Sequence, residues 1–192
     1  MITSVYIHIP FCDHLCNYCD FCKRYTNYKM IKDYLDALEE EIKEKYQDEE
    51  IKTLYIGGGT PSSLSLANLK RLMHIIKKFK LAKDYEFTIE VNPENVTKEK
   101  LELFKKFSIN RISIGVESTN IKFLKYLGRK HDFKLVCEKV QLMKKLGFNN
   151  INVDLIYALP NETLHDLKKD LDNILSLDIN HISTSSLEIH QN

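Results

Sequence analysis

The sequence predicts an α/β protein built as a partial (β/α)6 barrel, with parallel strands inside and helices outside. Three observations predict this fold. Six short runs rich in β-branched and aromatic residues alternate with stretches whose apolar residues recur at helical spacing. Each connection is long enough to hold a helix, so consecutive strands run parallel. The glycines, carboxylates and cysteines that interrupt the pattern fall where strands end.

The six runs are rich in the residue types that favour strands. They cover residues 4–9, 53–57, 86–91, 111–116, 151–156 and 181–189. Because a closed barrel of this kind has eight units, six units leave it open, with room for a larger ligand. A flat doubly wound sheet is the alternative. In both architectures ligands bind at the carboxyl ends of the strands.

Amphipathic helices are expected between the runs. Apolar residues recur at helical intervals within residues 31–46, 66–79, 101–107, 136–146 and 164–175. The boundary residues agree: Thr97 and Thr163 are suitable N-caps, and Asp166 stands three residues after Thr163. Gly147 suits the position just past a helix end.

Length, composition and charge set the broad class. The chain has 192 residues, of which 43% are apolar, enough for the core of one domain over residues 1–192. Lys and Arg number 28 against 27 Asp and Glu, a formal charge of +1, which argues against nucleic acid or a membrane surface as the main partner. No stretch approaches transmembrane length and no signal peptide is recognised, so a cytoplasmic protein without a membrane span is expected.

Three cysteines lie within eight residues as Cys12, Cys16 and Cys19. This spacing offers three thiolates to an iron–sulfur cluster whose four irons normally each take a cysteine, and so leaves one iron open to a small molecule. Cys22 follows closely, so zinc held by all four cysteines is the alternative. Zinc sites usually draw ligand pairs from separate parts of the chain, and the spacing therefore favours the cluster. Cys137, in a helical pattern, is interpreted as a small apolar residue.

Other polar residues collect at the same edge of the predicted sheet. Residues 57–60 read Gly-Gly-Gly-Thr, and glycines allow a backbone to approach a ligand closely; a simple turn before Pro61 is the alternative. Asp154 has apolar neighbours and needs a partner if buried. Arg129 is a natural counter-ion for a ligand carboxylate, although most such arginines lie at the surface.

The histidines carry weaker signals. His8 alternates with Tyr6 in the first strand and is interpreted as a hydrogen-bonded core residue. No metal-like spacing relates His14, His131, His181 and His190, so these four are assigned no role.

Taken in order, these segments resemble the radical S-adenosylmethionine (SAM) superfamily and, within it, the oxygen-independent coproporphyrinogen III oxidase group, which includes heme chaperones. The matching strings are YIHIPFC, CxxxCxxC, GGGTP, GVES, LGRKH, NVDLIYALP and HIS. The resemblance implies a partial (β/α)6 barrel, a [4Fe-4S] cluster on three cysteines, and SAM bound to the fourth iron through its amino and carboxylate groups. An electron from the reduced cluster would then cleave the sulfonium to methionine and a 5′-deoxyadenosyl radical.

The resemblance also implies roles for single residues. The cluster ligands would be Cys12, Cys16 and Cys19. The positions that match SAM contacts are Tyr6, Gly58, Gly59, Thr60, Glu90, Glu117, Arg129 and Asp154. Two residues depart from the group's pattern: Glu117 stands where glutamine is usual, so an amide donor becomes a carboxylate, and Ser185 stands where the last strand usually has an aromatic residue.

The string that follows the third cysteine separates the two branches of the group. Cys19-Asp20-Phe21-Cys22 resembles the CDF of heme chaperones rather than the CGC of the oxidases. The implied protein binds the cluster, SAM and heme, and passes heme to an acceptor protein. An electron donor such as a flavodoxin or ferredoxin is a further implied partner. Coproporphyrinogen III decarboxylation and a non-catalytic remnant are the alternatives.

Length is the largest departure from the group. Its members continue beyond the sixth strand into a C-terminal domain, which in the chaperones carries an HNxxYW-like motif associated with heme. The present sequence ends at Asn192 and contains no tryptophan. The expectation from sequence is therefore a radical SAM core domain without the C-terminal domain of its relatives.

Overall fold

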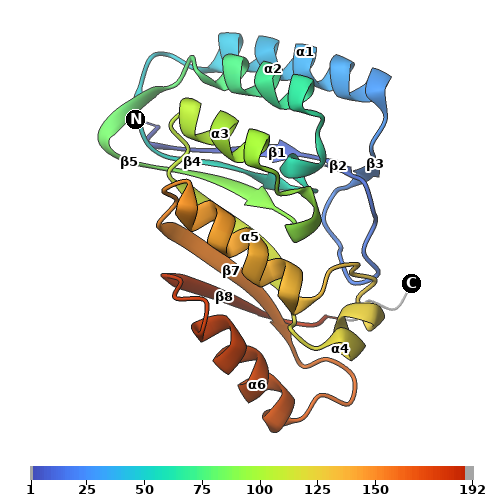
Figure 1. The fold of residues 1–192 in the computed structure, drawn as a ribbon. Helices are drawn as coiled ribbons and strands as arrows, with labels where there is room; N and C mark the ends of the chain where they lie inside the picture. The colour runs from blue at the N-terminus through green and yellow to red at the C-terminus, as the bar shows by residue number, and fades with distance from the viewer. Residues whose placement is uncertain (1, 189–192) are drawn as a thin grey trace.

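A six-stranded parallel sheet organises the computed structural model, which describes residues 2–188 (Figure 1). Its order follows the chain, β1-β4-β5-β6-β7-β8, and every neighbouring pair is parallel. The strands are β1 (Ser4–Ile9), β4 (Glu50–Gly58), β5 (Lys80–Val91), β6 (Arg111–Glu117), β7 (Asn150–Tyr157) and β8 (His181–Ser186). The predicted parallel α/β sheet is confirmed.

Helices connect successive strands. They are α1 (Tyr28–Lys45), α2 (Leu66–Ile76), α3 (Lys98–Lys106), α4 (Ile121–Tyr126), α5 (Phe133–Lys145) and α6 (Leu164–Leu175), with short 3-10 turns η1 (Pro61–Ser63) and η2 (Pro93–Asn95). Because crossovers between parallel strands share one hand, a sheet whose order follows the chain receives its helices on one face. This arrangement is that of a partial barrel rather than a doubly wound sheet (Figure 1).

Local signals placed three helix ends correctly. The Thr97 side chain accepts a hydrogen bond from the Lys100 backbone N–H at the start of α3. Thr163 and Asp166 form the reciprocal capping box of α6. Gly147 follows α5 with a φ of +82°, and the next N–H, that of Phe148, bonds back to the carbonyl of Met143, which closes the helix.

Several boundaries differ from the sequence prediction. β5 begins at Lys80 rather than at residue 86, and β8 ends at Ser186 rather than at residue 189. Helix α4 was not predicted, because six residues with a partly exposed apolar set give too short a pattern. Ile189 of the predicted last strand, and His190, lie outside the described residues.

The two faces of the sheet carry different side chains, as the alternation of a strand requires. Ile89, Ile112 and Val153 are fully buried against the helices, which include Leu35 of α1 and Val140 of α5. The opposite face presents polar side chains, among them Tyr55, Glu90, Ser113, Asp154 and Ser183. Packing of the apolar face therefore fixes the strand register, and with it the relative positions of the polar side chains on the opposite face.

A second, two-stranded sheet lies beside the end of β1. It pairs β2 (Phe11–Cys12) with β3 (Arg24–Tyr25), in register Cys12 with Tyr25. The residues between these strands form the loop that carries the other clustered cysteines. Within residues 2–188, no helix is long and apolar enough to cross a membrane.

Candidate functional site

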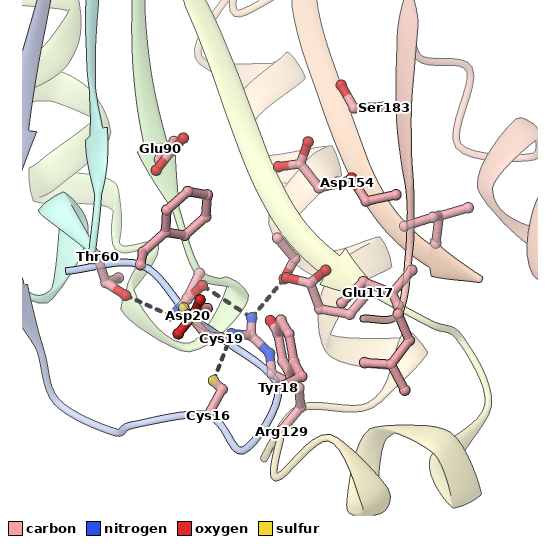
Figure 2. A pocket seen from close by; sticks show the side chains of 18 of the residues that line it. Cys16, Tyr18, Cys19, Asp20, Thr60, Glu90, Glu117, Arg129, Asp154 and Ser183 are labelled. Carbon is pink, nitrogen blue, oxygen red and sulfur yellow. Dashed lines mark hydrogen bonds between the residues drawn. The ribbon is translucent and has the colours of Figure 1, made fainter. Parts of the chain in front are cut away.

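A cavity of about 840 Å³ opens at the carboxyl ends of the strands. Its size lies within the range of small-molecule and cofactor sites, about 300 to 1,000 Å³. All but one of the site residues named from sequence line it: Cys12, Cys16, Cys19, Gly58, Gly59, Thr60, Glu90, Glu117, Arg129 and Asp154. Figure 2 shows Cys16 and Cys19 in the lower part of the view, with Glu90, Glu117 and Asp154 above them.

Tyr6 is the residue not brought to the cavity wall. It lies on β1 with 56% of its surface exposed, and its hydroxyl is 3.1 Å from Nδ1 of His8. Its ring lies 5.9 Å from that of Tyr55, whose hydroxyl donates to Glu90. Tyr6 therefore borders the site through Tyr55, and its contact with SAM stays a prediction.

We call residues 10–26 the cysteine loop. Cys12 is buried in β2, Cys16 and Cys19 are partly buried, and Cys22 is exposed. The ammonium group of Lys23 donates to the carbonyls of Cys16 (3.1 Å) and Cys19, which folds the loop back on itself. Cys22 is not among the residues that line the cavity, although its carbonyl lies 2.8 Å from Nε2 of His8.

The thiols of the loop are electrostatically coupled and hydrogen-bonded. Burial raises the pKa of Cys12, and the nearby Cys19 and Cys16 raise it further, while a hydrogen bond from Thr60 acts in the opposite direction. The Thr60 hydroxyl lies 3.6 Å from the Cys12 sulfur, and Nη1 of Arg129 lies 3.7 Å from the Cys16 sulfur. Donors aimed at sulfur stabilise the thiolate, which is the form that binds metal.

Asn92 joins these two donors into one relay. Its amide nitrogen donates to Thr60 Oγ1 (3.2 Å), and its amide oxygen accepts from Nη2 of Arg129 (3.0 Å). The relay thus runs from the Cys16 sulfur through Arg129, Asn92 and Thr60 to the Cys12 sulfur. The sequence alone gave Asn92 no role, because the relay depends on contacts between separate strand ends.

Two glycines allow the end of β4 to lie against the cysteine loop. A Cβ on Gly59 would stand 2.8 Å from the Phe11 carbonyl oxygen and 3.0 Å from the Cys12 sulfur. Gly58 adopts a φ of +108°, which other residues rarely reach. The Gly-Gly-Gly-Thr segment is therefore a close backbone approach and not only a turn before Pro61.

We call Glu90, Glu117 and Asp154, on β5, β6 and β7, the strand-end acids. The pKa of each is raised by burial. Glu90 accepts from the Tyr55 hydroxyl (2.7 Å) and the Gly58 backbone N–H (2.9 Å). Asp154 accepts from the Ser113 hydroxyl (2.9 Å) and the Asn152 amide (2.7 Å), so both carboxylates are held in fixed orientations.

Glu117 reaches the cavity because β6 ends irregularly. The pairing with β7 shifts register between Gly115 and Glu117, and Glu117 has a φ of +68°. A bulge re-aims a side chain, and a non-glycine residue in this region marks a strained position of the kind found at functional sites. Tyr18, between two of the cysteines, lowers the pKa of Glu117 against the effect of burial, so the cysteine loop and the end of β6 interact here.

Arg129 is the buried cation of the site. Besides its contacts with Cys16 and Asn92 it donates to the Gly115 carbonyl (2.6 Å), and Glu117 raises its pKa against the opposing effect of burial. Its Nε is buried and has no hydrogen-bond partner among the described residues. An unpaired buried donor is costly, and because Arg129 lines the cavity, an anionic ligand there would meet a buried cation.

His131 follows Arg129 in the sequence and was assigned no role. The structure buries its ring between Val116 and η2, with Nε2 3.0 Å from the Val116 carbonyl and Nδ1 3.4 Å from Glu94. Burial opposes ionisation of Glu94, but its contacts with His131 and Arg129 lower its pKa to about 2. His131 therefore braces the ends of β5 and β6 behind the cavity.

The residues present fit a cluster with an adjoining charged ligand. Three thiols, an unpaired arginine nitrogen and oriented carboxylates line one cavity. Within residues 2–188, no three Cys, His, Asp or Glu side chains are placed to hold a single metal ion. A four-iron cluster is larger than one ion, and its ligands stand farther apart.

Comparison with known proteins agrees with this geometry. A family model for the radical SAM superfamily matches residues 6–174. The chain is 42% identical over 191 residues to the heme chaperone HemW of Bacillus subtilis, covering 97% of this chain and 50% of that protein. It is 34% identical over 185 residues to the oxygen-independent coproporphyrinogen III oxidase of Salmonella typhimurium, covering 94% and 40%.

A solved structure extends the comparison to the fold. Coproporphyrinogen III oxidase (HemN) from Escherichia coli matches with a TM-score of 0.88 and 31% identity, over 97% of this chain and 44% of that one. The chain spans about half the length of the curated relatives it matches. Fold, cavity and family model agree, and the chain belongs to the radical SAM superfamily.

Proposed function

We propose that this chain is a radical SAM core of the heme-chaperone type, folded as one domain over residues 1–192. It holds a [4Fe-4S] cluster on Cys12, Cys16 and Cys19, binds SAM beside the cluster, and takes part in the delivery of heme to an acceptor protein in the cytoplasm. The observation that carries the proposal is one cavity in which these cysteines face Arg129 and the strand-end acids.

On the cysteine side, the chain supplies three sulfur ligands and neutralises their charge. Arg129 and Thr60 donate to two of the sulfurs, and Lys23 places a positive charge at the carbonyl side of the loop. Charged donors next to thiolates favour the deprotonated form. The fourth iron of a bound cluster would then be left for the amino and carboxylate groups of SAM.

On the strand side, the chain supplies groups of opposite charge for SAM. Arg129, with its unpaired Nε, suits the ligand's carboxylate, and the strand-end acids suit its cationic and hydroxyl groups. When cluster and SAM are bound, one electron from the cluster breaks a carbon–sulfur bond of the sulfonium. The packed sheet behind Glu90 and Asp154 keeps their carboxylates oriented and limits the entry of water.

The heme-chaperone assignment draws on two further observations. The string Cys19-Asp20-Phe21 has the form implied for that branch, and identity to a protein named heme chaperone HemW is 42%, against 34% for the oxidase. Heme or porphyrin is accordingly the proposed cargo. A flavodoxin or ferredoxin is the proposed source of electrons.

Anaerobic reconstitution with ferrous iron and sulfide tests the proposal. Wild-type protein and Cys22→Ala should each hold about four irons and four sulfides, whereas Cys12→Ala, Cys16→Ala and Cys19→Ala should each lose the cluster. Addition of SAM should change the electron paramagnetic resonance spectrum of the reduced cluster. Zinc without sulfide, or equal loss of metal in Cys22→Ala, would support a four-cysteine zinc site or a non-catalytic remnant instead.

A second experiment separates the two branches. Heme titration followed by absorbance should show binding of heme, and transfer to an acceptor apoprotein should follow. Incubation of the reduced protein with SAM and coproporphyrinogen III should leave the substrate unchanged. Formation of 5′-deoxyadenosine together with protoporphyrinogen would instead assign decarboxylation.

A further inference from the structure

Residues 21–32 form a mostly exposed segment, of which Phe21 and Lys23 line the cavity and the others do not. Four large apolar side chains lie on it with high exposure: Phe21 (68%), Tyr25 (61%), Tyr28 (79%) and Met30 (40%). Single exposed apolar side chains are normal on protein surfaces, whereas several gathered together are typical of interaction sites. We call residues 21–32 the aromatic-basic surface.

Every charged side chain within residues 21–32 is basic, and two neighbouring acids contact the segment, Asp13 at Thr26 and Asp36 at Lys32. Lys23, Arg24, Lys29 and Lys32 fall within it and no Asp or Glu does, whereas the whole chain carries a formal charge of only +1. Arg24, Lys29 and Lys32 are exposed. Lys23 is partly buried and bonds to the cysteine loop, and Lys32 pairs with Asp36, so Arg24 and Lys29 are the cations best placed to meet a partner.

The aromatic-basic surface forms the outer side of the cysteine loop. Tyr25 pairs directly with Cys12 across β2 and β3, and the Thr26 N–H donates to the Cys12 carbonyl (3.0 Å). Adjacent strands lie about 5 Å apart. A molecule seated on Tyr25 would therefore be separated from a cluster ligand by little more than one strand, and Lys23 links the same surface to Cys16 and Cys19.

We propose that the aromatic-basic surface is the docking site for a small acidic protein that carries single electrons. The inference rests on the proposed function, because a cluster at Cys12, Cys16 and Cys19 is the acceptor that a docked electron carrier would reduce. One electron would leave the carrier, which is oxidised by one equivalent, and enter the cluster, which is reduced by one equivalent; no atom or proton is transferred.

The composition suits such a short-lived contact. Aromatic residues, Met and Arg are enriched at protein interfaces. Electron-transfer encounters bury small areas, below about 1,200 Å², and depend on complementary charge for rapid association. Tyr25 and Tyr28 would provide the apolar centre, and Arg24 and Lys29 the basic rim. A nucleic acid or an acidic lipid surface would use the same cations, so the experiment must separate these partners.

The test compares two charge-reversed variants that change the net charge equally. Arg24→Glu/Lys29→Glu alters the proposed surface, and Lys168→Glu/Lys169→Glu alters exposed residues of α6, far from the cysteine loop (Figure 1). Reconstituted proteins are mixed with reduced flavodoxin, and reduction of the cluster is followed by absorbance. Dithionite, which needs no docking surface, is used in parallel.

Flavodoxin should reduce the Arg24→Glu/Lys29→Glu protein at least about tenfold more slowly than wild type at low salt, and the wild-type rate should fall as salt is added. Lys168→Glu/Lys169→Glu should change the rate by less than about twofold. Dithionite should reduce all three proteins equally. The affinity of oxidised flavodoxin for each cluster-free protein, measured by titration calorimetry, should follow the same order.

Distinct outcomes would overturn the inference. Equal flavodoxin rates for wild type and Arg24→Glu/Lys29→Glu would remove this surface as the docking site. If the flavodoxin rates are equal and Arg24→Glu/Lys29→Glu loses binding to phosphatidylserine vesicles, the surface binds a membrane instead. If the rates are equal and this variant loses self-association in sedimentation, the surface binds a second copy of the chain. A wild-type protein that holds no cluster, or whose cluster dithionite cannot reduce, would contradict the proposed function itself and is recognised before flavodoxin is added.

Discussion

The cysteine loop and the strand-end acids face each other across one cavity, yet they are held in different ways. Glu90, Glu117 and Asp154 lie on strands whose neighbouring residues, such as Ile89, Val116 and Val153, are completely buried. The cysteine loop has a two-residue strand pair, contacts from Lys23 and Arg129, and many exposed residues. The hydrophobic core fixes one wall before any ligand binds, whereas the other wall is held by a few hydrogen bonds and would gain order from the proposed cluster.

Removing core volume should have the largest effect on the sheet side. Ile112→Ala should lower the free energy of unfolding by about 2 to 5 kcal/mol, because Ile112 is fully buried in β6 and its loss leaves a cavity. Phe21→Ala, in the exposed part of the cysteine loop, should change it by less than about 0.5 kcal/mol. Urea unfolding of the cluster-free proteins measures both. Equal losses would show that the loop is part of the same cooperative core.

Arg129 connects the two walls, so its removal should damage ligand binding more than folding. Arg129→Met should weaken SAM binding to the reconstituted protein by about tenfold to a hundredfold, since Cys16 loses a donor and the ligand loses a buried cation. Arg129→Lys should recover only part of this, because an ammonium group cannot donate in several fixed directions. Equilibrium binding of SAM under anaerobic conditions provides the measurement; unchanged affinity in Arg129→Met would show that the two walls act independently.

Glu117 gives the sheet side a pH dependence. Its pKa is raised by burial, so the folded protein holds this proton more tightly than the unfolded chain does. The stabilisation is complete below the ordinary pKa of 4.5 and is lost as the pH rises through the higher pKa of the folded state. Glu117→Gln should therefore make the unfolding free energy fall less between pH 5 and pH 8 than it does in wild type.

The remaining pH dependence serves as an internal control. Glu90 and Asp154 also have raised pKa values, so Glu117→Gln should flatten the profile without abolishing it. Replacing the exposed Glu138 by Gln should leave the profile as in wild type. A profile unaffected by Glu117→Gln would mean that Arg129 keeps Glu117 ionised in the folded protein.

A small effect on stability is also expected at Lys23. Lys23→Met should change the unfolding free energy of the cluster-free protein by less than about 1 kcal/mol, because its partners are two carbonyls of a partly exposed loop. The reconstituted variant should nevertheless lose its cluster absorbance severalfold faster in the presence of a chelator. Cluster loss at the wild-type rate would show that β2 and β3 alone hold the loop in place.

Sequence alone determined the fold and most of the site. Strands and helices could be predicted because the spacing of apolar residues in each element reflects which face of it is buried. The caps at Thr97 and Thr163 could be predicted because a cap involves residues only three positions apart. The three cysteines were recognised by spacing. Arg129, Glu90 and Asp154 were named because strand ends meet at one edge and because the segments resemble a known family.

Tertiary structure decided how these residues act together. The relay through Asn92 and Thr60, the electrostatic interaction of Tyr18 with Glu117, and the hydrogen bonds of His131 join residues that are far apart in the chain. Each depends on strand register, and the aim of Glu117 depends on an irregular step at the end of β6. No periodic pattern encodes such contacts, because they arise only when separate segments are packed at fixed distances by the shared core.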